Sequence, residues 1–253
     1  AWAPFLQSCR GLAGKPQGAA WKRVCDLARG LDARHATKIR EFFEQQFQPY
    51  AVVAGDGNPS GLMTGYYEPL LKGSRVRSKA YGNPVLGVPD DLLTIDLAEV
   101  YPDLKNLRLR GRLQGNKVVP YFPRADINGQ IDRLQDKILL WVEDAVELFF
   151  LQVQGSGRVK LPDGSLVRLG YADQNGHPYQ SVGRLLVERG ALKLEEASMQ
   201  GIQAWGRANP AKLPELLNAN PSYVFFREMP SSADGPVGAL GVPLTAERSL
   251  AID

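Results

Sequence analysis

The sequence predicts a mainly-β fold with some helices, and the reasons are its composition and its turn signals. The 253 residues include 26 glycines and 18 prolines, more than the roughly 12% that is usual for the two together. Glycine and proline favour turns between short strands over long helices. Apolar residues make up 44% of the chain, enough to bury the core of one large domain or of two ordinary ones.

The first predicted elements are one helix and two strands. Ile39 and three phenylalanines form an apolar stripe at helical spacing, which predicts an amphipathic helix over 32–48. Its aromatic stripe is interpreted as core. Strands are expected over 50–54 and 61–67, separated by a turn at 55–59 that is rich in glycine.

A run of short strands is expected next, over residues 72–133. Apolar pieces alternate there with turn signals, at the spacing of a small barrel or sandwich. The turn signals are Gly73-Ser74, Gly82-Asn83-Pro84, Gly115-Asn116 and Asn128-Gly129. Because the texture of the sequence changes after Pro69, a boundary between two units is placed near Glu68.

The most strand-like texture lies over 138–142 and 146–154, where β-branched and aromatic residues are dense. Both segments are predicted to be strands that run through a barrel wall. A hairpin is expected to join 158–161 to 165–171, because Asp163-Gly164 readily takes the positive φ of a hairpin turn.

Helical signals return near the end of the chain. Ser181 can cap a helix over 181–189, and Gly190 can supply its left-handed stop. Three further short elements are predicted: helices over 195–207 and 210–218, and a strand over 223–226.

The charge is too balanced for a nucleic-acid-binding protein, with 30 basic and 27 acidic residues and a net charge of +3. One stretch is locally basic, and it is either a solvated face or a surface that attracts an acidic polymer such as a glycan bearing carboxylates. Its residues are Lys105, Arg108, Arg110, Arg112, Lys117, Arg124 and Arg133.

Composition alone leaves the cellular compartment of the protein undecided. No apolar run approaches the roughly 20 residues that span a bilayer, and the start at Ala1 lacks the charged and apolar regions of a signal peptide. The protein is therefore either cytosolic or stripped of its export signal. Cys9 and Cys25 are the only cysteines, and a disulfide and two buried thiols both remain open.

The sequence contains little that supports catalysis by a nucleophilic side chain or by a metal ion. His35 and His177 are the only histidines, no serine lies in a Gly-x-Ser-x-Gly elbow, and no zinc-binding pattern is present. We therefore expect no cofactor and no metal. The segment Gln154-Gly155-Ser156-Gly157 is either a bulge at a barrel rim or a place where backbone approaches a bulky ligand closely.

Two features suit a sugar ligand. Gly65-Tyr66-Tyr67-Glu68-Pro69 offers two aromatic rings and a carboxylate, although adjacent side chains on a strand point to opposite faces, so one tyrosine at most readily lines a cleft. Glycosidic cleavage usually needs two carboxyl groups. The candidates, which sequence alone does not rank, are Glu68, Glu143, Asp144, Asp173 and Asp253.

Several motifs in order resemble the membrane-bound lytic murein transglycosylase A family, from the first residues to the last. They are Thr64-Gly65-Tyr66-Tyr67-Glu68-Pro69, Pro120-Tyr121-Phe122-Pro123-Arg124, Val153-Gln154-Gly155-Ser156-Gly157, Tyr171-Ala172-Asp173-Gln174-Asn175-Gly176-His177 and Asn220-Pro221-Ser222-Tyr223-Val224-Phe225-Phe226. The resemblance implies a peptidoglycan lytic transglycosylase, a carbon-oxygen lyase that cleaves the β-1,4 bond between N-acetylmuramic acid and N-acetylglucosamine and leaves 1,6-anhydromuramyl ends.

The resemblance also implies a place in the cell. The enzyme would face the periplasm from the outer membrane, held by a lipid anchor that is absent from this chain. Its partner would be the peptidoglycan glycan strand, with other cell-wall enzymes as possible partners. The oxidising compartment favours a disulfide between Cys9 and Cys25.

The fold implied by the resemblance is a double-psi β-barrel interrupted by a second β-barrel. The first barrel, with N-terminal helices, would comprise residues 1–67 and 222–253, and the inserted barrel residues 68–221. The glycan would lie in a groove between them. The substrate-binding residues implied are Tyr66, Tyr67, Gln154, Gly155, Ser156 and Gly157.

The resemblance places the catalytic aspartate of the family downstream of Asp253. We therefore expect no residue of this sequence to act as the catalytic acid, and we expect the first barrel to lack strands. The alternative is a non-catalytic peptidoglycan-binding module that lacks the catalytic aspartate segment. A scaffold that recruits other cell-wall enzymes is a third hypothesis.

Overall fold

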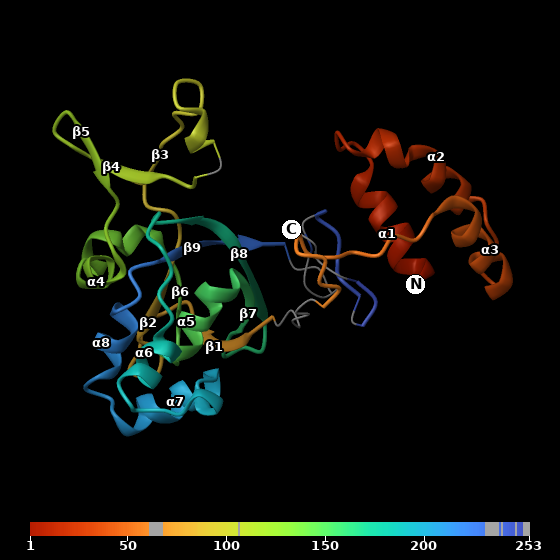
Figure 1. Cartoon of the computed structure of the whole chain (residues 1–253). Helices are drawn as coiled ribbons and strands as arrows, with labels where there is room; N and C mark the ends of the chain where they lie inside the picture. The colour runs from red at the N-terminus through yellow and green to blue at the C-terminus, as the bar shows by residue number, and fades with distance from the viewer. Residues whose placement is uncertain (61–67, 106, 231–237, 239, 246, 250–253) are drawn as a thin grey trace. The chain divides into compact units, whose positions relative to one another are not determined.

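The computed structural model describes residues 1–60, 68–105, 107–230, 238, 240–245 and 247–249 (Figure 1). Contacts divide the chain into two compact units. The first comprises Ala1–Tyr66 with Ser232–Asp253, and the second comprises Tyr67–Ser231.

Three helices make up most of the described part of the first unit: α1 (Trp2–Leu12), α2 (Gly18–Arg29) and α3 (Ala36–Gln46). Their shared core is aromatic, and the rings of Trp2 and Phe42 meet edge to face with centroids 5.0 Å apart. Helix α3 confirms the predicted helix and its apolar stripe, although it begins four residues later than expected.

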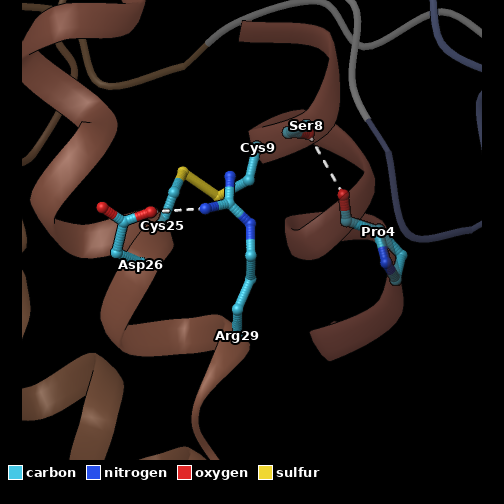
Figure 2. Close-up of a disulfide and its surroundings, with 6 residues drawn as sticks. All are labelled: Pro4, Ser8, Cys9, Cys25, Asp26 and Arg29. Carbon is cyan, nitrogen blue, oxygen red and sulfur yellow. Dashed lines mark hydrogen bonds and ion pairs between the residues drawn. A yellow bond between two sulfur atoms is a disulfide. The ribbon is translucent and has the colours of Figure 1, made fainter. Parts of the chain in front are cut away.

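A disulfide between Cys9 and Cys25 ties α1 to α2 (Figure 2). Both cysteines are buried, and the Arg29 guanidinium lies beside them in an ion pair with Asp26. The choice between a disulfide and two free thiols is therefore decided in favour of the disulfide.

The strand expected over 50–54 is wrong. These residues form a loop without strand pairing, in which the side chains of Tyr50 and Val52 are 79% and 89% exposed. A strand needs a partner to satisfy its backbone groups, and none of the described strands pairs with this segment. The turn expected after it is present, with Gly57 at a φ of 82°. The strand expected over 61–67 lies outside the described residues.

A six-stranded sheet forms the centre of the second unit, in the order β2-β6-β1-β7-β8-β9. Strands β1 and β7 run parallel and the other neighbours run antiparallel. The strands are β1 (Leu70–Ser74), β2 (Asn83–Leu86), β6 (Ile138–Val142), β7 (Ser156–Lys160), β8 (Leu166–Gln174) and β9 (Val224–Met229). Alternate residues of these strands, among them Leu71, Val159 and Leu169, build a buried core.

A smaller antiparallel sheet projects from the body of this unit (Figure 1). It consists of β3 (Leu93–Thr94), β4 (Arg110–Gln114) and β5 (Lys117–Pro120), with the short 3₁₀ helix η1 (Pro102–Leu104) in the connection. Leu113 and Val118, which face each other across β4 and β5, are largely exposed. The connecting Gly115 takes a φ of 59°, as the turn predicted there requires.

The remaining elements of the second unit are helical: α4 (Arg124–Gly129), η2 (Ile131–Lys137), α5 (Ala145–Gln154), α6 (Val182–Glu188), η3 (Leu194–Glu196), α7 (Met199–Ala208) and α8 (Leu213–Asn218). Helices α5 to α8 share a second apolar core that includes Phe149, Leu186, Ile202 and Leu216. None of the helices in the described ranges is long and apolar enough to cross a membrane.

The prediction of a strand over 146–154 is wrong, because this segment is helix α5. The Asp144 carboxylate accepts hydrogen bonds from the backbone N–H groups of Val146 and Glu147, at 2.7 and 2.9 Å, and so starts the helix. Leu148 and Leu151 pack into the core of the sheet, while Val146 and Phe149 pack into the helical core. A helix buried on two sides is apolar nearly all round, which removes the 3.6-residue period that would identify it.

Other local predictions are confirmed. Strands β7 and β8 pair antiparallel around Gly164, which has a φ of 85°. Ser181 caps α6 by accepting a hydrogen bond from the Arg184 N–H at 3.2 Å, and Gly190 takes the left-handed φ of 67°. The predicted strand near the end of the second unit is β9.

The fold is mixed α and β rather than mainly β, since more of the described residues lie in helices than in strands. The described strands form open sheets. The two β-barrels expected from the sequence remain a prediction. Strand β9 pairs with β8, so the contacts assign residues 224–229 to the second unit, whereas the expected division began the last segment of the first barrel at residue 222.

Candidate functional site

The predicted glycan-binding segment spans the junction of α5 and β7. Gln154 ends the helix, Gly155 is its cap, and Ser156 and Gly157 begin the strand. Gln154, Gly155 and Ser156 are half-buried, and Gly157 is buried. Tyr66 and Tyr67, the other predicted binding residues, lie outside the described part of the chain.

Gly155 and Gly157 are each required for a different structural reason. Gly155 has a φ of 77°, and its N–H donates to the Leu151 carbonyl at 2.9 Å, so it ends the helix in the left-handed conformation. A Cβ on Gly157 would lie 2.5 Å from Leu151 Cδ1 and 2.9 Å from the Pro69 carbonyl oxygen. The close backbone approach at Gly157 is therefore made by the chain itself.

Glu68 lies next to this segment and is held by two arginines. Its side chain is only 5% exposed, and its carboxylate oxygens lie 3.1 Å from Arg158 Nε and 3.5 Å from Arg168 Nε. Arg158 belongs to β7 and Arg168 to β8, and they face each other across the ladder. The contacts anchor the chain at the start of β1 and give this end of the sheet an excess of positive charge.

The other candidate carboxylates lie apart from Glu68 and have partners of their own. Glu143 lies 3.7 Å from Lys72 Nζ on the surface, and Asp144 caps α5. Asp173 on β8 accepts from Arg110 Nε at 2.8 Å. Asp253 is outside the described residues. The structure does not bring any two of the four described candidates together as an ion-paired or hydrogen-bonded couple.

Sequence reasoning missed a further carboxyl group, that of Glu147 in the first turn of α5. Burial raises the pKa of Glu147, and the neighbouring Asp144 carboxylate raises it further. No sequence signal pointed to it, because the segment was assigned to a strand with a different set of facing residues.

Three of the motifs that carry the family resemblance meet around Asn175, which is buried. Its side-chain amide donates to the carbonyls of Phe122 and Pro221 at 2.9 and 2.8 Å, and its Oδ1 accepts from the Tyr223 N–H at 2.8 Å. These residues belong to segments far apart in the sequence. Asn175 thus holds the three segments together by satisfying their backbone groups.

Arg124 extends the same network from the first of these motifs. It is buried, and its guanidinium donates to the carbonyls of Asn220 and Ser222 at 3.1 and 2.6 Å and to the Gln152 side chain at 2.5 Å. The ring of His177 is 2.7 Å from the Tyr121 carbonyl. The observed role of these motif residues is to stabilise the second unit.

The basic stretch is split by the fold. Arg124 is buried, Arg110 pairs with Asp173, and the Arg112 guanidinium lies 4.1 Å from the centre of the Phe122 ring. Lys105 and Lys117 are exposed on the projecting sheet and its connection. The described residues contain no group of three or more His, Cys, Asp or Glu side chains that could hold a metal ion.

A family model described as the MltA specific insert domain matches residues 62–227. The membrane-bound lytic murein transglycosylase A of Escherichia coli K12 is 35% identical over 230 residues, which cover 90% of this chain and 53% of the relative. The chain spans about half the length of the curated relatives that it matches.

Solved structures give the same relationship. MltA from Neisseria gonorrhoeae has a TM-score of 0.78 and 38% identity, with 96% of this chain and 66% of that chain covered. E. coli MltA with bound chitohexaose has a TM-score of 0.53 and 31% identity, with 72% of this chain and 46% of that chain covered. Because the family model covers well over half of the sequence, the chain belongs to the membrane-bound lytic murein transglycosylase A family.

Proposed function

We propose that the protein containing this chain is a peptidoglycan lytic transglycosylase that cleaves the β-1,4 bond between N-acetylmuramic acid and N-acetylglucosamine and leaves 1,6-anhydromuramyl ends. The observation that carries the proposal is the match of residues 62–227 to the insert domain of the family. The likeness to the gonococcal structure over 96% of this chain supports it.

This chemistry needs one acidic side chain. The acid protonates the leaving oxygen, and its conjugate base then helps the C6 hydroxyl of the sugar to attack C1. Glu68, Asp144 and Asp173 are engaged in structural contacts, so none of them is the acid in this proposal. The proposal places the catalytic aspartate downstream of Asp253.

The contribution of this chain is to hold the glycan. Tyr66 or Tyr67 would stack on a sugar ring, and the half-buried Gln154 and Ser156 would offer polar groups beside it. The E. coli relative with bound chitohexaose supports this, because chitohexaose and the murein glycan are both β-1,4-linked sugar chains. In this proposal residues 1–67 and 222–253 belong to a double-psi barrel, and residues 68–221 belong to an inserted barrel.

The proposed location is the periplasm, at the outer membrane, through a lipid anchor. The relatives from E. coli and Vibrio cholerae are named membrane-bound, which supports an envelope location. The disulfide between Cys9 and Cys25 supports an oxidising compartment. Other cell-wall enzymes are proposed as partners.

The activity is tested by digesting purified murein with the full-length protein and weighing the products by mass spectrometry. Anhydromuramyl ends are expected, and reducing ends would overturn the proposal. The role of this chain is tested by sedimenting it with insoluble murein. Tyr66→Ala or Tyr67→Ala should reduce the bound fraction with the fold intact, whereas the exposed Tyr50→Ala serves as a matched control.

A non-catalytic peptidoglycan-binding module is the second candidate. The observation that favours it is the structural engagement of the four described candidate carboxylates. If the 253-residue chain alone released anhydromuropeptides from murein, the binding-module hypothesis would fail.

A further inference from the structure

A pocket of about 500 Å³ lies within the second unit, and the predicted glycan-binding segment does not line it. Its volume is within the range of small-molecule sites, roughly 300–1,000 Å³. The wall combines apolar side chains with amides and two arginines. Its polar and aromatic lining residues include Arg77, Asn83, Arg124, Asn128, Trp141 and Gln152.

Arg124 places a buried positive charge in the wall of this pocket. Arg124 is only 5% exposed. No carboxylate in the described part of the chain lies within ion-pair distance of its guanidinium. Burial lowers the pKa of Arg124 to about 10, so the group is still charged at neutral pH. A buried charge without a counter-ion is costly, and an anion beside it would offset that cost.

The guanidinium keeps donors for such an anion. It carries five N–H groups, of which three point to Asn220, Ser222 and Gln152. One N–H therefore remains on each of Nη1 and Nη2. The rings of Phe149 and Tyr223 lie 4.9 and 5.0 Å from the guanidinium carbon, so aromatic rings also pack against this charge.

A second positively charged side chain, that of the exposed Arg77, lines the same pocket. The Arg77 guanidinium lies 5.1 Å from the centre of the Trp141 ring, and both residues line the pocket. The only acidic residue in the wall is Asp132, which is exposed. Two arginines, several amides and an apolar wall suit a ligand with one carboxylate and short aliphatic groups.

We propose that this pocket binds the carboxyl end of a peptide stem of peptidoglycan, with the terminal carboxylate toward Arg124 and the small aliphatic side chains against Trp141. The identity of the stem rests on the proposed function. The pocket would then hold the peptide part of the same polymer whose glycan part lies at the predicted binding segment.

The probe is N-acetyl-D-alanyl-D-alanine, titrated into the isotope-labelled 253-residue chain and followed by NMR. Shifts are expected at pocket residues, including the Arg124 Nε–H, which reports on the buried guanidinium without a substitution. The C-terminal amide of the probe should bind roughly tenfold more weakly, because it loses the charged hydrogen bonds. Arg77→Ala should weaken binding several-fold, and the nearby exposed Lys79→Ala, outside the pocket wall, is the matched control.

The inference is overturned if the pocket signals stay unchanged, if the amide binds as well as the acid, or if Arg77→Ala binds as the unaltered chain does. The probe contains no sugar, so this result is independent of the murein digestion. Cleavage without probe binding would remove the pocket proposal alone, and probe binding without cleavage would remove only the proposed activity.

Discussion

The backbone N–H of Tyr223 donates a 2.8 Å hydrogen bond to Oδ1 of Asn175, and this contact joins the residue after β8 to the residue before β9. The backbone N–H of Asn175 in turn donates to the Tyr223 carbonyl at 3.0 Å. The strand pair therefore continues through a side chain where the regular ladder ends. Removing that side chain takes a hydrogen-bond partner away from the Phe122 carbonyl and from the Tyr223 N–H.

Asn175→Ala should lower the free energy of unfolding by about 3 kcal/mol, because it leaves buried donors and acceptors unpaired. Denaturant unfolding measures the change. Asn116→Ala, at an exposed turn of the projecting sheet, is the matched control and should stay within about 0.5 kcal/mol of the unaltered chain. Equal losses for the two variants would contradict the role assigned to Asn175.

The pair of Arg110 and Asp173 should couple the projecting sheet to the central sheet. The two side chains are only 15% and 18% exposed, and Arg110 Nε lies 2.8 Å from Asp173 Oδ1. A double-mutant cycle with Arg110→Ala and Asp173→Ala should give a coupling energy of about 1–2 kcal/mol, because the pair is largely shielded from water. A coupling energy near zero would show that the contact is no stronger than a surface ion pair.

Local signals made part of this fold predictable. The Asp163-Gly164 turn, the Ser181 cap and the Gly190 stop each act within a few residues, so the hairpin and α6 were predicted correctly. The sequence did not predict helix α5, because its apolar residues pack into two different cores. Apolar residues on several faces give neither the 3.6-residue spacing of a helix nor the alternation of a strand. The apolar texture predicted burial, and tertiary context decided the conformation.

The candidate site was predictable in its residue types and not in its contacts. Glu68 could be named as a carboxylate, but Arg158 and Arg168, which hold it, lie some 90 to 100 positions away in the sequence. Sheet pairing across β1, β7 and β8 brings them together. Gly157 was singled out for close approach, and only the register shows that the approaching backbone is Pro69.

The Glu147 carboxyl should make stability depend on pH. Its pKa is raised in the folded state, so the folded protein binds more protons than the unfolded chain just above the ordinary glutamate pKa. Stability should therefore fall as pH rises from the unfolded pKa of glutamate through the folded one. Glu147→Gln should remove this part of the pH dependence and melt at a higher temperature than the unaltered chain at pH 7. Thermal melts from pH 4 to pH 7 measure the effect, and parallel curves for the two proteins would refute it.

Removal of the disulfide should loosen the first unit. The bridge closes a loop across 16 positions, and loops of this size are worth about 3 kcal/mol in the chain-entropy model. Cys9→Ala together with Cys25→Ala should speed amide hydrogen exchange in α1 and α2, while amides of β7 and β8 in the other unit keep their protection. Unchanged exchange in α1 and α2 would show that the aromatic core of the unit suffices without the bridge.

The pairing register of the central sheet places the first and last strands of the second unit close together, and this affects how the unit can be inserted into another protein. Leu70 is opposite Arg158, Arg158 is opposite Arg168, and Arg168 is opposite Met229, so the first and last strands of the second unit share one rung of the ladder. Three strand spacings separate them, roughly 15 Å. The chain thus enters and leaves this unit through nearby positions, and a recipient protein would need only a short gap between two of its own residues to accept it. Evolution could lengthen, exchange or delete such a cassette with little disturbance to its host.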